Sequence, residues 1–435
     1  MNRIFLERAL IFIGAIFYLF LFPHGIHGDA TDRYNSLLTL LETGVVTPMT
    51  FSYIGPLVSA PLLLLGKLVK TEFWWLSRFN TLLFLGLLFY LWRFLRREFN
   101  EGQLRVVALL LLGATMFPKN VTDYYGETFC VTAMIIAIGS FIDGRFFIGA
   151  ALCLLSVGNA PATIAAGSLF TVLFLLRERS SRYLFLIPLF VGLILLENYL
   201  KVGGFGFAQM KSMPGPSILP YAATPGFSYP FLFGLLSVLF SFGKGLLFFS
   251  PGLIAYFSPA ASLVSPRLRA LLFACLFYLI GMLPFYCRWW GWHGDWFWGP
   301  RYFLITSVMC VLLLAILLTH DRVSRPWKIF AFFAGALSFW VGCQGVLFGQ
   351  DFLEDCSRRG TELSFICNYV PEYSVLWRTF FADPQIRGRK VAYLIYFILA
   401  AAAVLWRPGQ DNFRWAWQWL RGYAKERWSG GPWRI

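Results

Sequence analysis

The feature that most constrains the fold of this chain is a long series of apolar segments separated by short basic ones. Of its 435 residues, 58% are hydrophobic and 14% are charged, which is too apolar for a soluble protein and typical of one with many membrane helices. The formal net charge is +15, but the lysines and arginines cluster between the apolar segments, as orientation signals do. The sequence therefore predicts an all-α polytopic membrane protein and gives no reason to expect a nucleic-acid partner.

The predicted transmembrane helices number about twelve. The first is the apolar run from Ala9 to Phe22, which lacks a small-residue cleavage site and is expected to be retained. The others are expected at residues 74–95, 104–118, 128–142, 146–158, 161–176, 183–200, 246–264, 270–286, 302–319, 328–348 and 390–406. Because basic loops favour the cytoplasmic side, residues 93–105 and both termini are placed inside.

Some helices are expected to lie along the membrane rather than across it. Residues 34–44 form an amphipathic pattern, and residues 54–69 are apolar but contain Pro56 and Pro61. At about 1.5 Å per residue the second segment reaches only ~24 Å, short of the ~30 Å hydrocarbon core. Both are therefore predicted as juxtamembrane helices in the first outer loop. The basic, tryptophan-rich tail 414–428 is predicted to lie on the inner leaflet.

The predicted organisation has three parts: a membrane core at 1–348, an extracytoplasmic loop at 349–389, and a last helix with a basic cytoplasmic tail at 390–435. Cys356 and Cys367 fall in the outer loop. They could form a disulfide if that side is oxidising, or they could be unrelated thiols, and their spacing does not decide between the two.

Carboxylates gather in the predicted outer loops. Asp29 and Asp32 follow the first helix, and Asp123 and Glu127 lie four residues apart in another outer turn. A charge at the edge of a membrane is costly unless it is solvated, paired or used. Each pair can be interpreted as functional or as capping the helix that follows it.

An outer segment rich in tryptophan, residues 287–302, is a candidate ligand-binding segment. It could be an ordinary aromatic belt at the membrane interface. Its interspersed glycines and charges instead favour ligand binding, with the arginines on phosphate or sugar and a tryptophan stacked on a sugar. The candidates are Arg288, Trp290, Trp292, His293, Asp295, Arg301 and Tyr302. Lys244, between two glycines, is either a further ligand contact or a lysine that snorkels to the interface.

Four short motifs carry a resemblance to a known family. They are Gly28-Asp29, the turn from Asp123 to Glu127, the segment from Phe240 to Pro251 and the segment from Trp289 to Tyr302. Together with the topology of about the first 310 residues, they resemble the GT-C superfamily of membrane glycosyltransferases, close to its protein O-mannosyltransferase and aminoarabinose transferase branch. Where that family has an acidic pair, this chain has Asp29-Ala30.

The resemblance implies that a sugar moves from a polyprenyl-phosphate donor to a hydroxyl acceptor on a glycan, lipid or protein. The reaction would occur on the extracytoplasmic face of a multi-pass protein of the bacterial inner membrane. Asp29 would act as general base, assisted by Asp32, and cations would stabilise the leaving phosphate. No cofactor is certain, and a divalent metal ion beside Asp29 is left open. One alternative is a transporter or flippase of a lipid-linked or small solute, which normally shows internal repeats and ionisable residues in mid-helix. The other is a non-catalytic membrane scaffold or lipid-binding protein.

Overall fold

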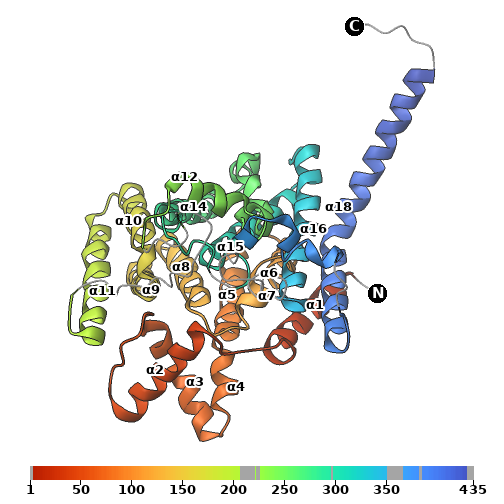
Figure 1. Ribbon diagram of the computed structural model, residues 1–435. Coiled ribbons are helices and arrows are strands. Elements are labelled where there is room, and N and C mark those ends of the chain that lie inside the picture. Colours follow the sequence, from red (N-terminus) through yellow and green to blue (C-terminus); the bar gives the residue numbers. More distant parts are fainter. Residues whose placement is uncertain are drawn as a thin grey trace.

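The computed structural model describes residues 3–205, 221, 226–294, 297–349, 366–381 and 385–428, with only the backbone described for 419–428. Within these ranges the regular elements are helices, as predicted (Figure 1). The principal α-helices are α1 (Arg3–Ile16), α2 (Asp29–Thr43), α3 (Ile54–Leu68), α4 (Glu72–Ser77), α5 (Phe79–Leu95), α6 (Glu101–Gly113), α7 (Phe117–Asn120), α8 (Gly126–Ile142), α9 (Phe146–Asn159), α10 (Ile164–Glu178), α11 (Leu186–Val202), α12 (Phe231–Phe240), α13 (Leu246–Phe249), α14 (Pro266–Tyr286), α15 (Ile305–Thr319), α16 (Arg325–Leu347) and α18 (Arg389–Trp428).

Among the described residues, seven helical segments are long and apolar enough to cross a membrane. They are Arg3–Leu21, Glu72–Leu95, Pro161–Glu178, Ser181–Val202, Pro266–Tyr286, Arg325–Leu347 and Arg389–Gln418. Shorter apolar helices include α3, α8, α9, α12 and α15. A multi-pass membrane protein is supported, whereas the predicted count of about twelve spans is not confirmed.

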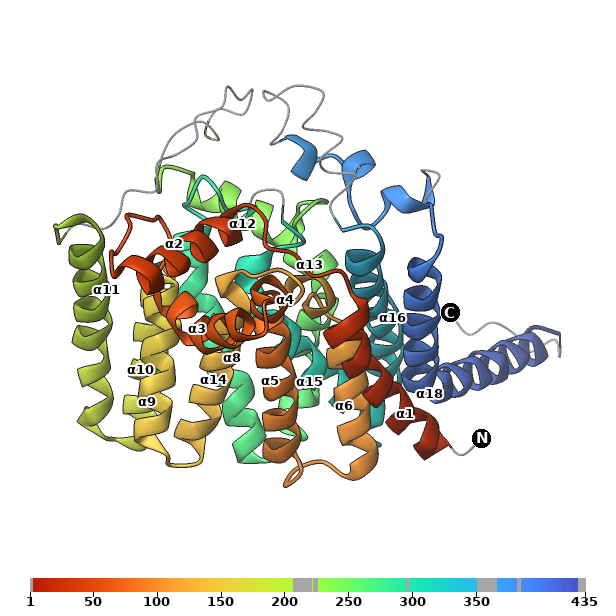
Figure 2. The same cartoon turned by 90° about the horizontal axis from the view of Figure 1, so that it is seen from below.

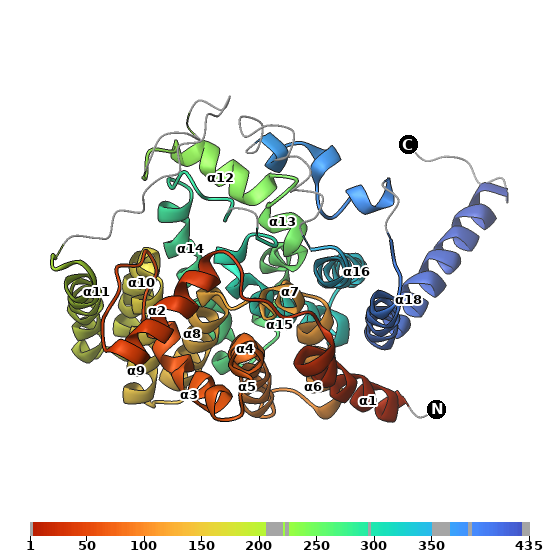
Figure 3. The ribbon, with the colours of Figure 1, turned by 60° about the horizontal axis from the view of Figure 1, so that its bottom comes forward.

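The helices fall into two orientations. Figure 3 looks almost along the bundle, with α9, α10 and α11 end on, whereas α2 and α12 lie across them. A helix forms where residues 34–44 were predicted to be helical, but α2 begins at Asp29 rather than at residue 34 and ends at Thr43, before Gly44 with a φ of +72°. The early start places Asp29 and Asp32 in the first turn of the helix.

One predicted helix is wrong, and another was missed. Residues 246–264 do not form a single span: α13 has four residues, followed by the 3₁₀ turns Pro251–Phe257 and Pro259–Ser262. Each proline lacks the amide hydrogen that a continuing α-helix needs, and each therefore starts a new turn. The ten-residue α12, Phe231–Phe240, lies where no helix was predicted.

The last helix and the basic tail are continuous. Residues predicted as a membrane helix and a separate interfacial helix form the 40-residue α18, which contains Pro408. Figure 2 shows that the two parts of α18 run in different directions. A proline inside a helix removes one backbone hydrogen bond and clashes with the preceding turn, which accounts for the bend.

Most cysteines are small buried packing residues. Cys130, Cys153, Cys275, Cys287, Cys310 and Cys343 are free and buried. Cys367 is disulfide-bonded and buried. Cys356, with which a disulfide was left open from the sequence, lies outside the described residues.

Candidate functional site

The centre of the candidate site is the buried guanidinium of Arg301, which joins two carboxylates from distant parts of the chain. Its Nη2 lies 3.1 Å from Oδ2 of Asp29, and its Nε lies 3.4 Å from Oε1 of Glu127. The Arg301 side chain is only 5% exposed. Its guanidinium carbon also lies 3.9 Å from the centre of the Phe297 ring. Three residues predicted from three separate segments therefore meet in one ionic cluster.

The start of α2 positions Asp29. Gly28 has a φ of +56°, a left-handed conformation that favours glycine. A side chain at Gly28 would also lie 3.3 Å from the Phe297 ring. Just before it, the backbone oxygen of His27 accepts a 2.9 Å hydrogen bond from the Tyr125 hydroxyl. The α2 N-cap is Gly28, and Asp29 is the first residue inside the helix, so Asp29 is not the cap and has Arg301 as its partner.

Asp123 forms a second ion pair beside this cluster. Its carboxylate lies 3.0 Å from Nζ of Lys119. Burial raises the pKa of Asp123, and the nearby Lys119 opposes that shift. The backbone is held by Asn80, whose Nδ2 donates to the carbonyl oxygens of Asp123 and Tyr125 at 2.7 Å each.

Asp123 and Glu127, four residues apart, do not lie on one face of a helix. Helix α8 begins at Gly126, so Glu127 is in its first turn whereas Asp123 precedes it in a turn. Backbone pairing joins that turn to Gly25, whose amide donates to Thr122 at 3.0 Å. Each of the two carboxylates consequently has its own cation.

The carboxylates differ in their access to solvent. The Asp29 side chain is 29% exposed, against 18% for Glu127 and 15% for Asp123. Asp32 is exposed in the same first turn of α2. Asp29 therefore combines a buried cationic partner with the best access for an incoming hydroxyl group among the three paired carboxylates.

The tryptophan segment is largely a packing element. Trp292 and Trp298 are 3% and 2% exposed, and their rings contact Tyr369 and Phe249 at centroid distances of 5.7 and 5.3 Å. Buried rings of this kind differ from an interfacial belt, but they are also closed to a sugar. Trp290 is half-buried and remains the better candidate for stacking.

Lys244 is a buried cation that holds the backbone of this segment. It is 1% exposed, so it is not a snorkelling lysine. Its Nζ donates to the carbonyl oxygen of Phe297 and, at 3.4 Å, to that of Gly299. A contact with a ligand stays a prediction, whereas fixing the backbone next to Arg301 follows directly from these bonds.

The remaining candidates, Tyr302, Arg288 and Asp295, differ in their contacts and in their exposure to solvent. Tyr302 stacks on Tyr286 at 4.6 Å and lies 5.2 Å from the Arg301 guanidinium. Arg288 is exposed, unlike Arg301. Asp295 lies outside the described residues, so its predicted role is neither supported nor opposed.

His293 is buried next to the cluster, and we expect it to make the stability of the protein depend on pH. Burial, with Lys244 and Arg301 nearby, lowers the pKa of His293 from 6.5 to about 3. Below pH 6.5 the unfolded chain binds a proton that the native chain does not, so stability falls with falling pH. Between pH 6.5 and 5 we expect a loss of about 2 kcal/mol from this residue.

Denaturant unfolding of purified protein at several pH values measures this loss. His293→Asn should flatten the profile between pH 6.5 and 5 relative to the native protein. Parallel profiles for the two proteins would contradict a neutral buried His293.

One buried residue of the site was not predicted. Arg33 lies four residues after Asp29 in α2, so both project from one face of the helix. Arg33 is 8% exposed, and its Nε and Nη1 have no hydrogen-bond partner within the described part of the chain. A side chain at Gly126 would lie 3.2 Å from both of its terminal nitrogens. The sequence signal for Arg33 is its spacing of four residues from Asp29, which places both on one helical face. That signal was missed because the helix was predicted to start at residue 34 rather than at Asp29.

Comparison with known proteins does not assign this chain to a family. No protein-family model, curated protein or solved structure matches this chain. Within the described ranges, no group of three or more histidine, cysteine, aspartate or glutamate side chains is placed to hold a metal ion. The functional argument therefore rests on the residues of the site.

Proposed function

We propose that this protein is a membrane glycosyltransferase that moves a sugar from a polyprenyl-phosphate donor to a hydroxyl acceptor on the extracytoplasmic side. The observation that carries the proposal is the cluster of Asp29, Arg301 and Glu127. It offers an accessible carboxylate whose position is fixed by a buried cation, which is what a general base needs.

The proposed reaction is a single displacement at the anomeric carbon of the sugar. Asp29 accepts the proton of the acceptor hydroxyl while the acceptor oxygen bonds to that carbon. The bond from the carbon to the phosphate oxygen breaks, and polyprenyl phosphate leaves with the electron pair. A cation near the phosphate stabilises the charge that develops there.

Arg33 is the arginine best suited to contact the donor phosphate. Arg301 already serves Asp29 and Glu127, whereas Arg33 has nitrogen donors without a hydrogen-bond partner among the described residues. The Arg33 guanidinium lies 4.6 Å from the centre of the Phe51 ring, but its two buried nitrogens without hydrogen bonds still carry a cost. A phosphate would offset that cost one helical turn away from the proposed base.

Arg33→Gln is expected to weaken donor binding by about 10- to 100-fold, because a charge-assisted hydrogen bond contributes about 1.5–3 kcal/mol. Arg33→Lys should restore little, since an ammonium cannot reproduce the planar fork of a guanidinium. The measurement is the dissociation constant for a polyprenyl-phosphate sugar.

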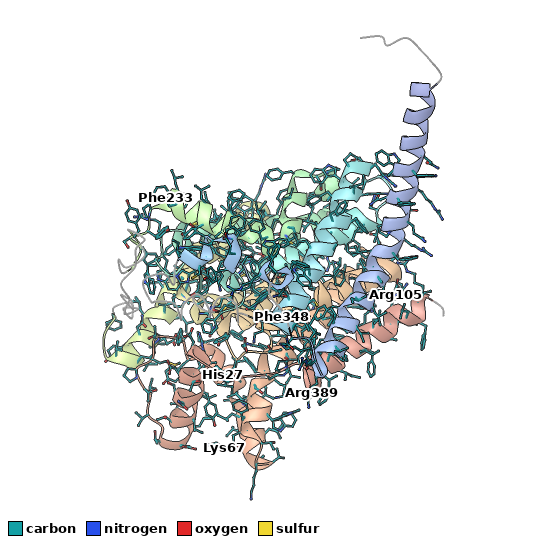
Figure 4. The ribbon with its side chains drawn as sticks, turned by 45° about the vertical axis from the view of Figure 1, so that its right-hand side comes forward. His27, Lys67, Arg105, Phe233, Phe348 and Arg389 are labelled. Carbon is teal, nitrogen blue, oxygen red and sulfur yellow. The ribbon has the colours of Figure 1, made fainter. Side chains whose placement is uncertain are left out.

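Lys67→Gln is the matched control for Arg33→Gln. Lys67 is a more exposed cation in α3, paired with Glu42 at 2.7 Å, and Figure 4 shows it far out on the same group of helices. Its loss should leave donor affinity unchanged. Equal donor affinity in Arg33→Gln and Lys67→Gln would contradict a phosphate contact at Arg33.

The transporter alternative gains little from Glu197, an ionisable residue inside the apolar helix α11. Glu197 in α11 accepts hydrogen bonds from the backbone of Tyr53 at 2.6 Å and from the hydroxyl of Ser52 at 2.9 Å. It also pairs with Lys201 at 3.5 Å. These bonds fasten the start of α3 to α11, which is a structural role.

The decisive experiment uses the full chain in sealed vesicles with polyprenyl-phosphate donors radiolabelled in the sugar. A glycosyltransferase releases polyprenyl phosphate and labels a hydroxyl acceptor. Movement of intact donor across the bilayer without cleavage would support the transporter instead. Neither turnover nor movement with a panel of donor sugars would overturn the proposal.

A further inference from the structure

A second polar site lies where α1 ends beside the start of α18. A hollow of about 500 Å³ opens there, which we call the α1–α18 hollow. Its lining includes four cations, Arg78, Arg387, Arg389 and Lys390. Among the described residues that line it, none is a carboxylate. Figure 4 shows Arg389 at the end of α18 that faces α1.

The concentration of positive charge is unfavourable without an anion. Arg78 follows α4, whereas the other three cations lie just before α18 or in its first turn, so two distant segments direct like charges to one hollow. Like charges repel, and low-dielectric walls strengthen the repulsion. The predicted topology places these residues at the outer end of α18, where lysine and arginine are not needed as orientation signals.

The cation from the first segment is held rigidly. Arg78 donates from Nε to the carbonyl oxygen of Leu19 at 3.2 Å and from Nη1 to the hydroxyl of Ser77 at 2.8 Å. Its guanidinium lies 4.3 Å from the centre of the Trp74 ring. Leu19 belongs to a π-helical turn, Phe17–Leu21, a conformation often found at functional sites.

The other side of the hollow is fastened to the same turn. The Tyr393 hydroxyl donates to the carbonyl oxygen of Leu21, and its ring packs against Phe22 at 5.1 Å. Phe20, 57% exposed, lines the hollow as well. The site thus joins an apolar wall, at the end of a membrane-spanning segment, to four cations.

We infer that the α1–α18 hollow binds the phosphate group of a membrane lipid, with the four cations on the phosphate and the apolar wall against the chain. A phospholipid and a polyprenyl phosphate present the same chemistry here. The hollow shares no lining residue with the cluster of Asp29, Glu127 and Arg301. The inference therefore stands whether or not the proposed transferase activity does.

The test measures dissociation constants of the purified full chain for dioctanoyl phosphatidic acid, a short-chain polyprenyl phosphate, dioctanoyl phosphatidylcholine and inorganic phosphate. The two lipid phosphates should bind at least about 10-fold more tightly than phosphatidylcholine or inorganic phosphate. Whichever of these two binds more tightly identifies the source of the phosphate as a phospholipid or a polyprenyl phosphate. If phosphatidylcholine bound as tightly as phosphatidic acid, the hollow would not be an anion site. If inorganic phosphate bound as tightly, the ligand would not be a lipid.

A triple variant locates the binding. Arg387→Gln, Arg389→Gln and Lys390→Gln together should weaken binding of phosphatidic acid by about 10-fold or more. The matched control replaces three exposed cations elsewhere in the chain with glutamine. They lie at the C-terminal end of α5, whereas Arg78 precedes its N-terminal end: Arg93, Arg96 and Arg97.

The control variant should bind phosphatidic acid as the native chain does. Arg78→Gln provides a second variant on a separate element and should also weaken binding. Native affinity in both the α18 triple variant and Arg78→Gln would overturn the inference.

Discussion

Asp29→Asn is expected to lower turnover by about 10²- to 10⁴-fold, the usual cost of losing a general base. The amide keeps an oxygen that can accept the hydrogen bond from Arg301, now 3.1 Å from the carboxylate. The geometry should therefore survive while the proton acceptor is lost. Initial rates with a polyprenyl-phosphate sugar, and donor affinity measured separately, check this result.

Two carboxylates nearby serve as controls for Asp29. Asp32 is exposed in the same helical turn, so Asp32→Asn should reduce turnover much less. Asp123 is paired with Lys119, and Asp123→Asn should act chiefly on stability. Near-normal turnover in Asp29→Asn would disprove the assignment and direct attention to Glu127 and then Asp123.

The fold could be predicted wherever a local pattern decided it. Long apolar runs predicted helices at α5, α14 and α16, and their boundaries agree to within a few residues. The prediction was wrong at residues 246–264, where composition suggested a span but Pro251 and Pro259 divide the chain into short turns. Hydropathy measures burial in an apolar environment and does not by itself specify an unbroken helix.

The residues of the candidate site could be predicted individually, but their pairing could not. Asp29, Glu127 and Arg301 were chosen because charges are costly near a membrane. The Asp29–Arg301 pair joins positions 272 residues apart, and no sequence spacing indicates such a contact. The sequence left open whether Lys244 contacts a ligand or snorkels, because two flanking glycines do not reveal that its ammonium is buried against the carbonyl oxygens of Phe297 and Gly299.

Arg301→Gln should produce the largest loss of stability at the site. Removing one member of a buried ion pair leaves the other charge uncompensated, which typically costs about 3–5 kcal/mol. Here two carboxylates lose their partner, but Asp29 is 29% exposed and water offsets part of its loss, so we expect about 3 kcal/mol. Denaturant unfolding measures this change, and turnover should fall with it because Asp29 is no longer held in place.

A comparison of three variants separates the charge of Arg301 from its shape. Arg301→Lys keeps the charge, but an ammonium lacks the rigid fork that now reaches Asp29 through Nη2 and Glu127 through Nε. Turnover should stay low in Arg301→Lys even where stability partly recovers. In Arg301→Gln/Asp29→Asn, the loss of stability should be smaller than the sum of the single losses, because the second change removes the charge that the first left unpaired. If the two losses of stability were strictly additive, the ion pair would not couple α2 to the segment before α15. If Arg301→Lys were fully active, Asp29 would not depend on a guanidinium for its position.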